Sequence, residues 1–175
     1  AQALRVSNPG CYPTGAIGLL GPLVRAGLVP ADYPVTVHAV SGYSGGGRAS
    51  VDAYEGPGGP QGPAFQLYGL GLAHKHTPEI ERHAGLTQRP VFVPAYGAFR
   101  QGIALTVPLQ LRLLPSGVDM QRLHACLQQH FHAMPVQCAK ALRQLTVLAI
   151  PKAAVGQHAV YIKGDELYLS SQFAY

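Results

Sequence analysis

The segment "SNPGCYPTG", residues 7–15, places a cysteine between a turn-forming Pro-Gly pair and Tyr-Pro-Thr. Cys11 follows a predicted short strand that runs into a turn, residues 3–10, and precedes a helix predicted over Thr14–Ala26. The free N–H groups and positive end of a helix stabilise a thiolate, and they can also bind an oxyanion formed at an attacked carbonyl. The pattern predicts a cysteine nucleophile. The alternative is a small buried thiol that serves packing only.

The segment "HKH" supplies a possible proton-transfer group. It precedes a helix predicted to begin with Thr77 as N-cap and Pro78 as first residue, and to stop at Gly85. On an extended segment His74 and His76 would point to opposite sides, so one of them would face a cysteine site. A solvent-exposed pair is the alternative. No further ligands stand at zinc-binding spacing, so we predict no metal site.

The glycine-rich segment "SGYSGGGR", residues 41–48, is a candidate phosphate-binding loop, with Arg48 supplying positive charge. Any tight connection rich in glycine would look similar. The GK[ST] ending of a P-loop is absent, and no segment matches GxGxxG. The sequence therefore carries no dinucleotide fingerprint of its own.

Composition limits the class of protein. The length of 175 residues suits one domain, and 47% of the residues are hydrophobic. Only 12% are charged, against about a quarter in typical domains, so we expect part of the surface to pack on another domain or subunit. The net charge of +5 comes from scattered residues. This favours a small anionic substrate over nucleic acid.

The cysteines indicate a reducing compartment. There are three, Cys11, Cys126 and Cys138, with no CxxC pair. An odd number without a motif fits reduced thiols in a cytoplasmic protein better than a disulfide framework. We identify no signal peptide and no apolar run long enough to span a bilayer, so we predict no membrane association.

Strand and helix patterns alternate irregularly along the rest of the chain, which predicts an α+β fold with helices on one face of a mixed sheet. A Gly/Pro-rich loop is expected over residues 55–63, and a final hairpin is expected to turn at Gly164-Asp165. The predicted strands are residues 34–41, 90–97 and 102–114, and a further helix is predicted over residues 116–134.

Four segments together resemble the N-acetyl-γ-glutamyl-phosphate reductase family: "SNPGCYPTG", "SGYSGGGR", "YGLGLAHKHTPEIE" and "VPAYGAFRQGI". They occur in the family's order and at plausible spacing. The resemblance implies a largely antiparallel mixed sheet like the C-terminal domain of glyceraldehyde-3-phosphate dehydrogenase. It also implies that residues 1–175 form the catalytic and dimerisation domain of a longer enzyme, without the family's NADP-binding Rossmann domain.

The resemblance further implies a mechanism. The Cys11 thiolate would attack the acyl phosphate carbon, phosphate would leave, and hydride from NADPH would reduce the thioester to N-acetylglutamate 5-semialdehyde. His74 is the first choice for the acid/base, with His76 second. The same resemblance implies a homodimer or homotetramer, in the pathway of arginine biosynthesis.

Substrate and cofactor contacts also follow from the resemblance. Arg48, Arg100 and Ser44 are candidates to bind the phosphate and carboxylate groups, since arginine pairs well with both anions. Gly42, Ser44 and Pro9 are expected near the nicotinamide end of NADP.

Three alternatives compete with this interpretation. A related reductase acts on a carrier-bound aminoadipate phosphate in lysine biosynthesis and shares these motifs. A Cys-His acyl hydrolase or acyltransferase would use the same pair without hydride transfer. A non-catalytic interaction domain would use Cys11 for packing alone.

Overall fold

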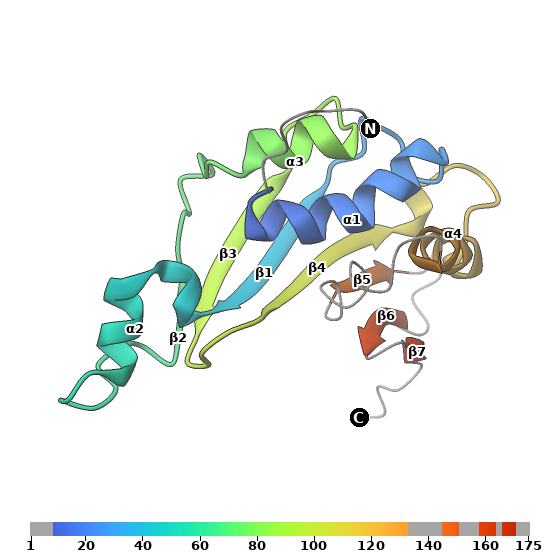
Figure 1. Cartoon of the computed structure of the whole chain (residues 1–175). Helices are drawn as coiled ribbons and strands as arrows, with labels where there is room; N and C mark the ends of the chain where they lie inside the picture. Colours follow the sequence, from blue (N-terminus) through green and yellow to red (C-terminus); the bar gives the residue numbers. More distant parts are fainter. Residues whose placement is uncertain (1–8, 133–144, 151–157, 164–165, 171–175) are drawn as a thin grey trace, which may run out of the picture.

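A single mixed sheet forms the centre of the molecule in the computed structural model, which describes residues 9–132, 145–150, 158–163 and 166–170 (Figure 1). Its strands stand in the order β2-β3-β1-β4-β5-β6-β7. The β1–β3 and β4–β5 pairs are parallel and the other four pairs are antiparallel. The predicted α+β class and the largely antiparallel mixed sheet are confirmed. The strands are β1 (Thr36–Gly42), β2 (Phe65–Leu67), β3 (Val91–Gly97), β4 (Ile103–Gln110), β5 (Leu145–Ile150), β6 (His158–Lys163) and β7 (Glu166–Ser170).

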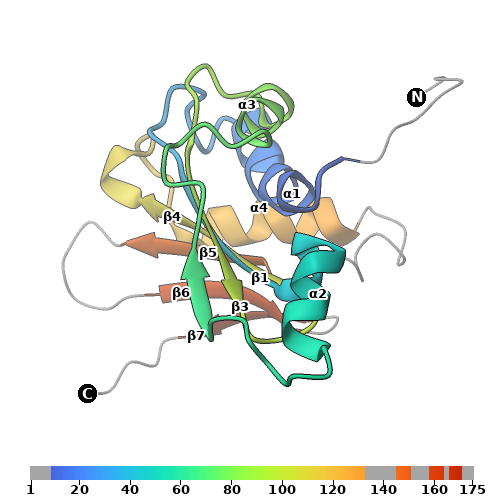
Figure 2. The same ribbon diagram turned by 90° about the vertical axis from the view of Figure 1, so that its left-hand side faces the viewer.

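Three helices cover one face of this sheet (Figures 1 and 2). They are α1 (Cys11–Arg25), α3 (Thr77–Ala84) and α4 (Met120–His132), and α1 packs against both of the others. The fourth helix, α2 (Arg48–Glu55), stands apart from them near the end of the sheet (Figure 1). Short 3-10 turns, η1 (Tyr43–Gly46) and η2 (Leu111–Leu113), follow β1 and β4.

The core lies between the sheet and the three helices. Alternate residues of β1 and β4 are buried, as expected for strands with one covered face. From α1, Leu19, Leu20 and Leu23 are fully buried against them. Each such leucine contributes about 1.5–3 kcal/mol of burial free energy. By contrast, residues 55–73, which are rich in glycine, proline and polar side chains, are mostly exposed.

Several helices and strands begin at other residues than predicted, or were not predicted at all. Helix α1 begins at Cys11, three residues before the predicted Thr14, because Gly10 is the N-cap and the first turn accommodates Pro13. Helix α2 and strands β2 and β5 were not predicted. Strands β6 and β7 pair with Lys163 opposite Glu166, which confirms the hairpin. Its turn, residues 164–165, the predicted first strand up to residue 8, and Cys138 lie outside the described residues.

Candidate active site

Cys11 is the first residue of α1 and its side chain is exposed. Gly10, the N-cap, has an extended backbone and contributes no capping side chain. The first turn of α1 contains no acidic residue either. The positive end of the helix is therefore directed at the thiol and at any anion beside it. This placement agrees with the predicted cysteine nucleophile, whose chemistry remains a proposal.

A pocket of about 160 Å³ opens beside Cys11. It lies where α1 begins, β1 ends and β4 starts. The structure thus brings Cys11 together with Gly42 and Ser44, two residues named from the sequence, while Pro9 is exposed just before the helix. The lining residues are Cys11, Tyr12, Ser41, Gly42, Ser44, Gly45, Gly102 and Ile103.

His74 and His76 lie side by side, with ring centroids 4.9 Å apart. The expectation that the two rings point to opposite sides is wrong, because the segment is a turn and not extended. The backbone N–H of His76 donates to Nδ1 of His74 at 3.2 Å. The predicted N-cap was one residue off: Thr77 is the first residue of α3 and His76 is its N-cap. The Thr77 hydroxyl donates to the His74 carbonyl at 2.8 Å. The predicted stop at Gly85 is confirmed by its left-handed backbone.

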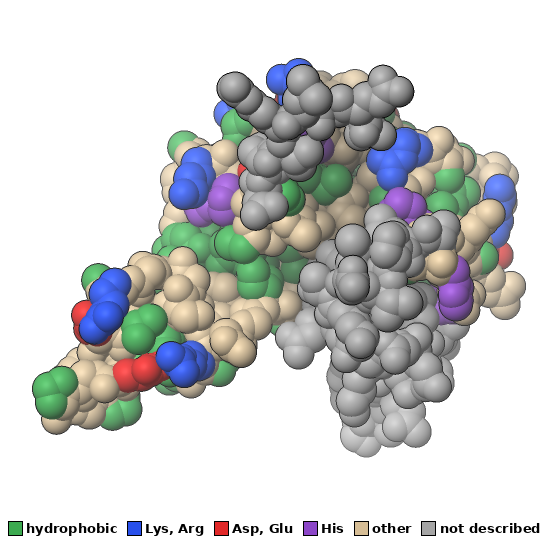
Figure 3. All heavy atoms as spheres, in the orientation of Figure 1, with side chains coloured by type: hydrophobic (Ala, Val, Ile, Leu, Met, Phe, Trp, Pro, Cys, Tyr) green, Lys and Arg blue, Asp and Glu red, His purple; other side chains and the backbone are tan. Residues whose placement is uncertain are grey.

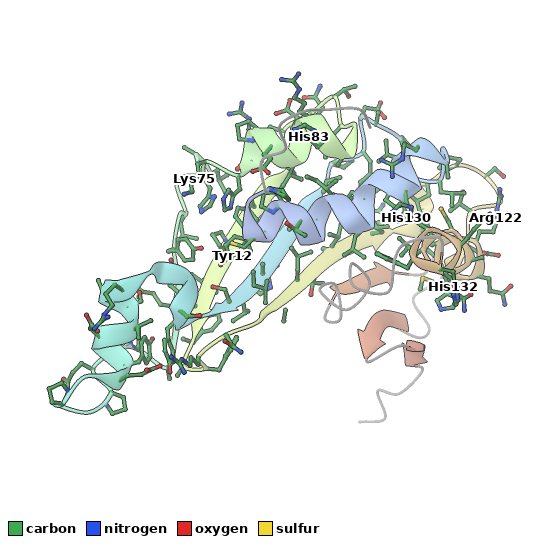
Figure 4. All side chains as sticks on the ribbon, in the orientation of Figure 1. Tyr12, Lys75, His83, Arg122, His130 and His132 are labelled. Atoms are coloured by element: carbon green, nitrogen blue, oxygen red, sulfur yellow. The ribbon has the colours of Figure 1, made fainter. Side chains whose placement is uncertain are left out.

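The segment that carries His74 and His76 packs against Gly10, the residue before Cys11. A Cβ built on Gly10 would lie 2.5 Å from Nε2 of His76, so the imidazole ring lies directly against the backbone before Cys11. The N–H of Gly10 donates to a carboxylate oxygen of Glu79 in α3, at 3.0 Å. Figure 4 shows Tyr12 at the start of α1 and Lys75 on the neighbouring segment that carries the histidines. These contacts hold the histidine segment against the backbone that precedes Cys11.

Burial favours the neutral form of both histidines. It lowers the pKa of His74, and the neighbouring His76 and Lys75 lower it further. Burial also lowers the pKa of His76, Glu79 acts in the opposite direction, and Lys75 adds to the lowering. Both rings are therefore neutral near pH 7, which is the state able to accept a proton from a thiol.

Three hydroxyl groups form a hydrogen-bonded chain under the pocket. Tyr68 donates to the Tyr12 hydroxyl at 2.9 Å, and Tyr12 donates to Ser41 Oγ at 2.9 Å. Burial raises the pKa of Tyr12 and of Tyr68, so both phenols stay protonated. The Tyr12 ring also packs edge-to-face with the rings of His74 and His76, with ring centroids 6.2 and 6.0 Å apart.

Four residues at this site were not predicted from the sequence: Ser41, Tyr12, Tyr68 and Glu79. The first two lie within the motifs quoted for the loop and the cysteine, and Tyr68 and Glu79 lie in the histidine motif. Their adjacency to Cys11 and the histidines was the available signal. Sequence spacing could not predict that Tyr12 meets Tyr68, 56 positions away, or that Gly10 meets Glu79, 69 positions away.

The two arginines that were predicted to bind substrate, Arg48 and Arg100, do not line the pocket. The Arg48 guanidinium pairs with Asp52 at 2.8 Å within α2, and the Arg100 guanidinium lies 3.2 Å from Glu55. Their side chains are 88% and 67% exposed, and neither lines the pocket. Figure 3 shows basic and acidic side chains next to one another in the projecting region around α2, at the lower left of the view. In this structure the arginines are not gathered around Cys11.

Within the described ranges, no group of three or more His, Cys, Asp or Glu side chains is arranged to hold a metal ion. Over the same residues, the helices are too short or too polar to cross a membrane.

Comparison with known proteins gives a consistent result. Residues 11–165 match the family described as semialdehyde dehydrogenase, dimerisation domain. The chain is 65% identical over 148 residues to N-acetyl-gamma-glutamyl-phosphate reductase 2 of Pseudomonas putida, covering 81% of this chain and 47% of that protein. It is 56% identical over 182 residues to the Burkholderia cenocepacia reductase, covering 99% and 58%. The Rhizobium etli reductase is 46% identical, with 86% and 51% covered. This chain thus spans about half the length of these relatives, and it belongs to the semialdehyde dehydrogenase dimerisation domain family.

Proposed function

We propose that residues 1–175 are the catalytic and dimerisation domain of a cytoplasmic N-acetyl-γ-glutamyl-phosphate reductase of arginine biosynthesis. The names of the relatives support the reaction, and the family description supports the assembly. The observation that carries the proposal is the position of Cys11, exposed at the uncapped start of α1 and fastened to a pair of neutral histidines.

The first chemical step uses only groups of this chain. The Cys11 thiolate attacks the acyl carbon, a C–S bond forms, and the C–O bond to phosphate breaks with its electron pair leaving on phosphate. The N–H groups at the start of α1 stabilise the negative charge that develops on the acyl oxygen. The product of this step is a thioester on Cys11.

The contact between His76 and Gly10 supports His76 as the group that takes the Cys11 proton. The sequence alone ranked His74 first, but its Nδ1 is occupied by the backbone N–H of His76. We therefore assign His74 a positioning role. Glu79 favours the protonated form of His76, so its carboxylate would stabilise the imidazolium formed when the thiol loses its proton.

The cofactor is expected to reach the same pocket. When bound, NADPH would supply the hydride that reduces the thioester. The pocket walls of Gly42, Ser44 and Gly45 are small and leave room beside Cys11, so they fit the reactive end of such a cofactor. A Rossmann domain, which would hold the pyrophosphate, is proposed for the remaining length seen in the relatives. Arg48, Arg100 and Pro9 would join the site only with the substrate or that domain present.

The test is NADPH oxidation by the full-length protein with N-acetyl-γ-glutamyl phosphate. We expect NADPH-dependent reduction by the whole protein. The 175-residue chain alone should form a mass adduct on Cys11 but neither reduce it nor bind NADPH tightly. Phosphate release without NADPH oxidation in the full-length protein would instead establish a hydrolase, and a preference for the carrier-bound aminoadipate phosphate would move the enzyme to lysine biosynthesis.

Assembly is tested separately. We propose a homodimer or homotetramer formed through this domain. Sedimentation of the chain over a series of concentrations should show a species larger than a monomer, because mass action favours the assembled form as the concentration rises. A monomer alone would contradict the proposed assembly without affecting the chemistry.

A further inference from the structure

The chain of hydroxyl groups under the pocket has no role in the mechanism above. Ser41 and Tyr12 line the pocket beside Cys11, and both are only 3% exposed. Ser41 is one of two buried polar or charged side chains among the described residues, the other being Thr77. A buried hydroxyl at a site open to ligand needs a partner for each of its hydrogen-bonding groups.

The direction of the chain leaves one proton over. A phenol is more acidic than an aliphatic alcohol and is the better donor, so Tyr12 donates to Ser41 Oγ at 2.9 Å. Tyr68 in turn donates to Tyr12 at 2.9 Å. With Tyr12 already donating to Ser41 Oγ, the Ser41 proton is directed away from Tyr12. The space available to it is the pocket, where the missing side chain of Gly45 leaves room next to Ser41 Oγ.

The chain is held rigidly. The Tyr68 ring stacks on Tyr96 with centroids 4.4 Å apart and planes 6° from parallel. The Tyr12 ring packs edge-on against Phe92 at 5.1 Å. These ring contacts favour the positions that the hydroxyl groups take in the series, in which each hydrogen bond strengthens the next.

We propose that Ser41 is a hydrogen-bond donor to an oxygen of the acyl phosphate bound at Cys11, and that Tyr12 and Tyr68 are positioning residues that fix the direction of its proton. This rests on the proposed acyl phosphate chemistry. Ser41 would touch the substrate and is therefore a candidate catalytic residue, whereas both tyrosines act through it.

The experiment measures acylation of Cys11 by acetyl phosphate in the full-length protein, followed by intact-mass spectrometry, so no reduction is needed. Ser41→Ala should slow acylation about 10- to 100-fold, the range for a hydrogen bond to a charged group. Tyr12→Phe keeps the ring and should slow it about threefold to tenfold. In the Ser41→Ala background, Tyr12→Phe should cause less than about a twofold further change, because it acts through Ser41.

Two controls separate chemistry from folding. Alkylation of Cys11 by iodoacetamide involves no acyl oxygen in the reaction, so its rate should be unchanged in Ser41→Ala. Tyr33→Phe is the matched tyrosine variant, since Tyr33 is 4% exposed and its hydroxyl accepts the Gln110 N–H at the opposite end of the sheet. It should lose a comparable hydrogen bond and acylate at the normal rate.

The proposal is overturned if Ser41→Ala acylates within twofold of the unsubstituted protein, or if Tyr12→Phe slows acylation equally with and without Ser41. It is also overturned if iodoacetamide alkylation falls in parallel with acylation, which would indicate a displaced Cys11. If the unsubstituted protein is acylated neither by acetyl phosphate nor by N-acetyl-γ-glutamyl phosphate, the proposed function itself fails. Normal acylation that is insensitive to Ser41 contradicts only the present inference.

Discussion

The region around Cys11 and the projecting region around α2 both carry motifs expected at one site, yet they are built differently. Around Cys11, partners distant in sequence converge: Gly10 with Glu79, and Tyr12 with both Ser41 and Tyr68. Around α2 the polar contacts are mostly local, such as the Arg48–Asp52 pair four residues apart. No residue of α2 is buried.

This difference shows what a buried framework adds to a motif. The cysteine and histidine groups are positioned by packing, which fixes their geometry before any ligand binds. The guanidinium groups of Arg48 and Arg100 are held only by exposed ion pairs, each worth little free energy. The chain thus holds the cysteine and histidine side chains in a packed framework, whereas its two arginines stand on an exposed segment.

The strongest test of the region around Cys11 is removal of the thiol that we propose as the nucleophile. In the full-length protein, Cys11→Ser should lower NADPH-dependent reduction by on the order of 10³-fold or more, because a serine hydroxyl is scarcely ionised at neutral pH. Cys126→Ser is the control, since Cys126 is half-buried on α4 with its sulfur 3.7 Å from the Pro22 carbonyl. Steady-state kinetics with circular dichroism should show a folded, inactive first variant and an active second one. Equal losses would refute the assignment of Cys11.

The histidine pair gives the next largest effect. His76→Asn should lower kcat by about 10²- to 10⁴-fold with a smaller change in KM, because proton transfer acts in the transition state. His74→Asn should lower kcat less, since it removes only the acceptor for the His76 N–H. The measurement is kcat and KM for both variants. A larger loss at His74 would restore the order favoured by the sequence alone.

Much of the fold could be predicted because its signals are local. The alternation of β1 and β4, the glycine stop at Gly85 and the helix after Cys11 each depend on a few neighbouring residues. The relative placement of His74 and His76 could not be predicted, since it depends on a turn stabilised by Thr77. Helix α2 was missed because three glycines precede it and no apolar stripe marks it.

Substituting Gly10, which lies between Cys11 and the His76 ring, should lower kcat/KM about 100-fold, the effect of a misplacement of about 1 Å. Gly10→Ala would put a methyl group against the His76 ring, so either the ring or the start of α1 must move. Gly71→Ala is the matched control, because a Cβ there meets nothing within 4 Å. The two variants should be compared in kcat/KM and in iodoacetamide alkylation of Cys11. Normal activity in Gly10→Ala would show that the His76 contact is not needed.

The lowered pKa of both histidines predicts a pH dependence of a definite sign. Above the ordinary histidine pKa of about 6.5, the rings are neutral in both folded and unfolded chains, and stability should not change on their account. As pH falls through that value and towards the lower folded pKa, the unfolded chain binds protons first, so the folded state loses stability. Urea unfolding at pH 7.5 and pH 5 should show this loss, and it should be smaller in the His74→Asn/His76→Asn double variant. An equal loss in both proteins would assign the effect to other groups.

The smallest effects are expected in the projecting region, where they decide whether the two regions ever work together. If the structure as it stands is the active arrangement, Arg48→Ala and Arg100→Ala should each change KM for the acyl phosphate by less than about threefold, because neither side chain lines the pocket and exposed charge pairs are worth only about 0–1 kcal/mol. A rise of tenfold or more in KM for Arg100→Ala alone would show that this side chain leaves Glu55 and reaches the substrate. Arg100 is the more informative of the two, since its own carbonyl accepts the N–H of Ser44, a residue of the pocket. Glu55→Gln is its partner control: weakening the ion pair should lower KM if Arg100 must be released to bind the substrate, and leave KM unchanged if it does not.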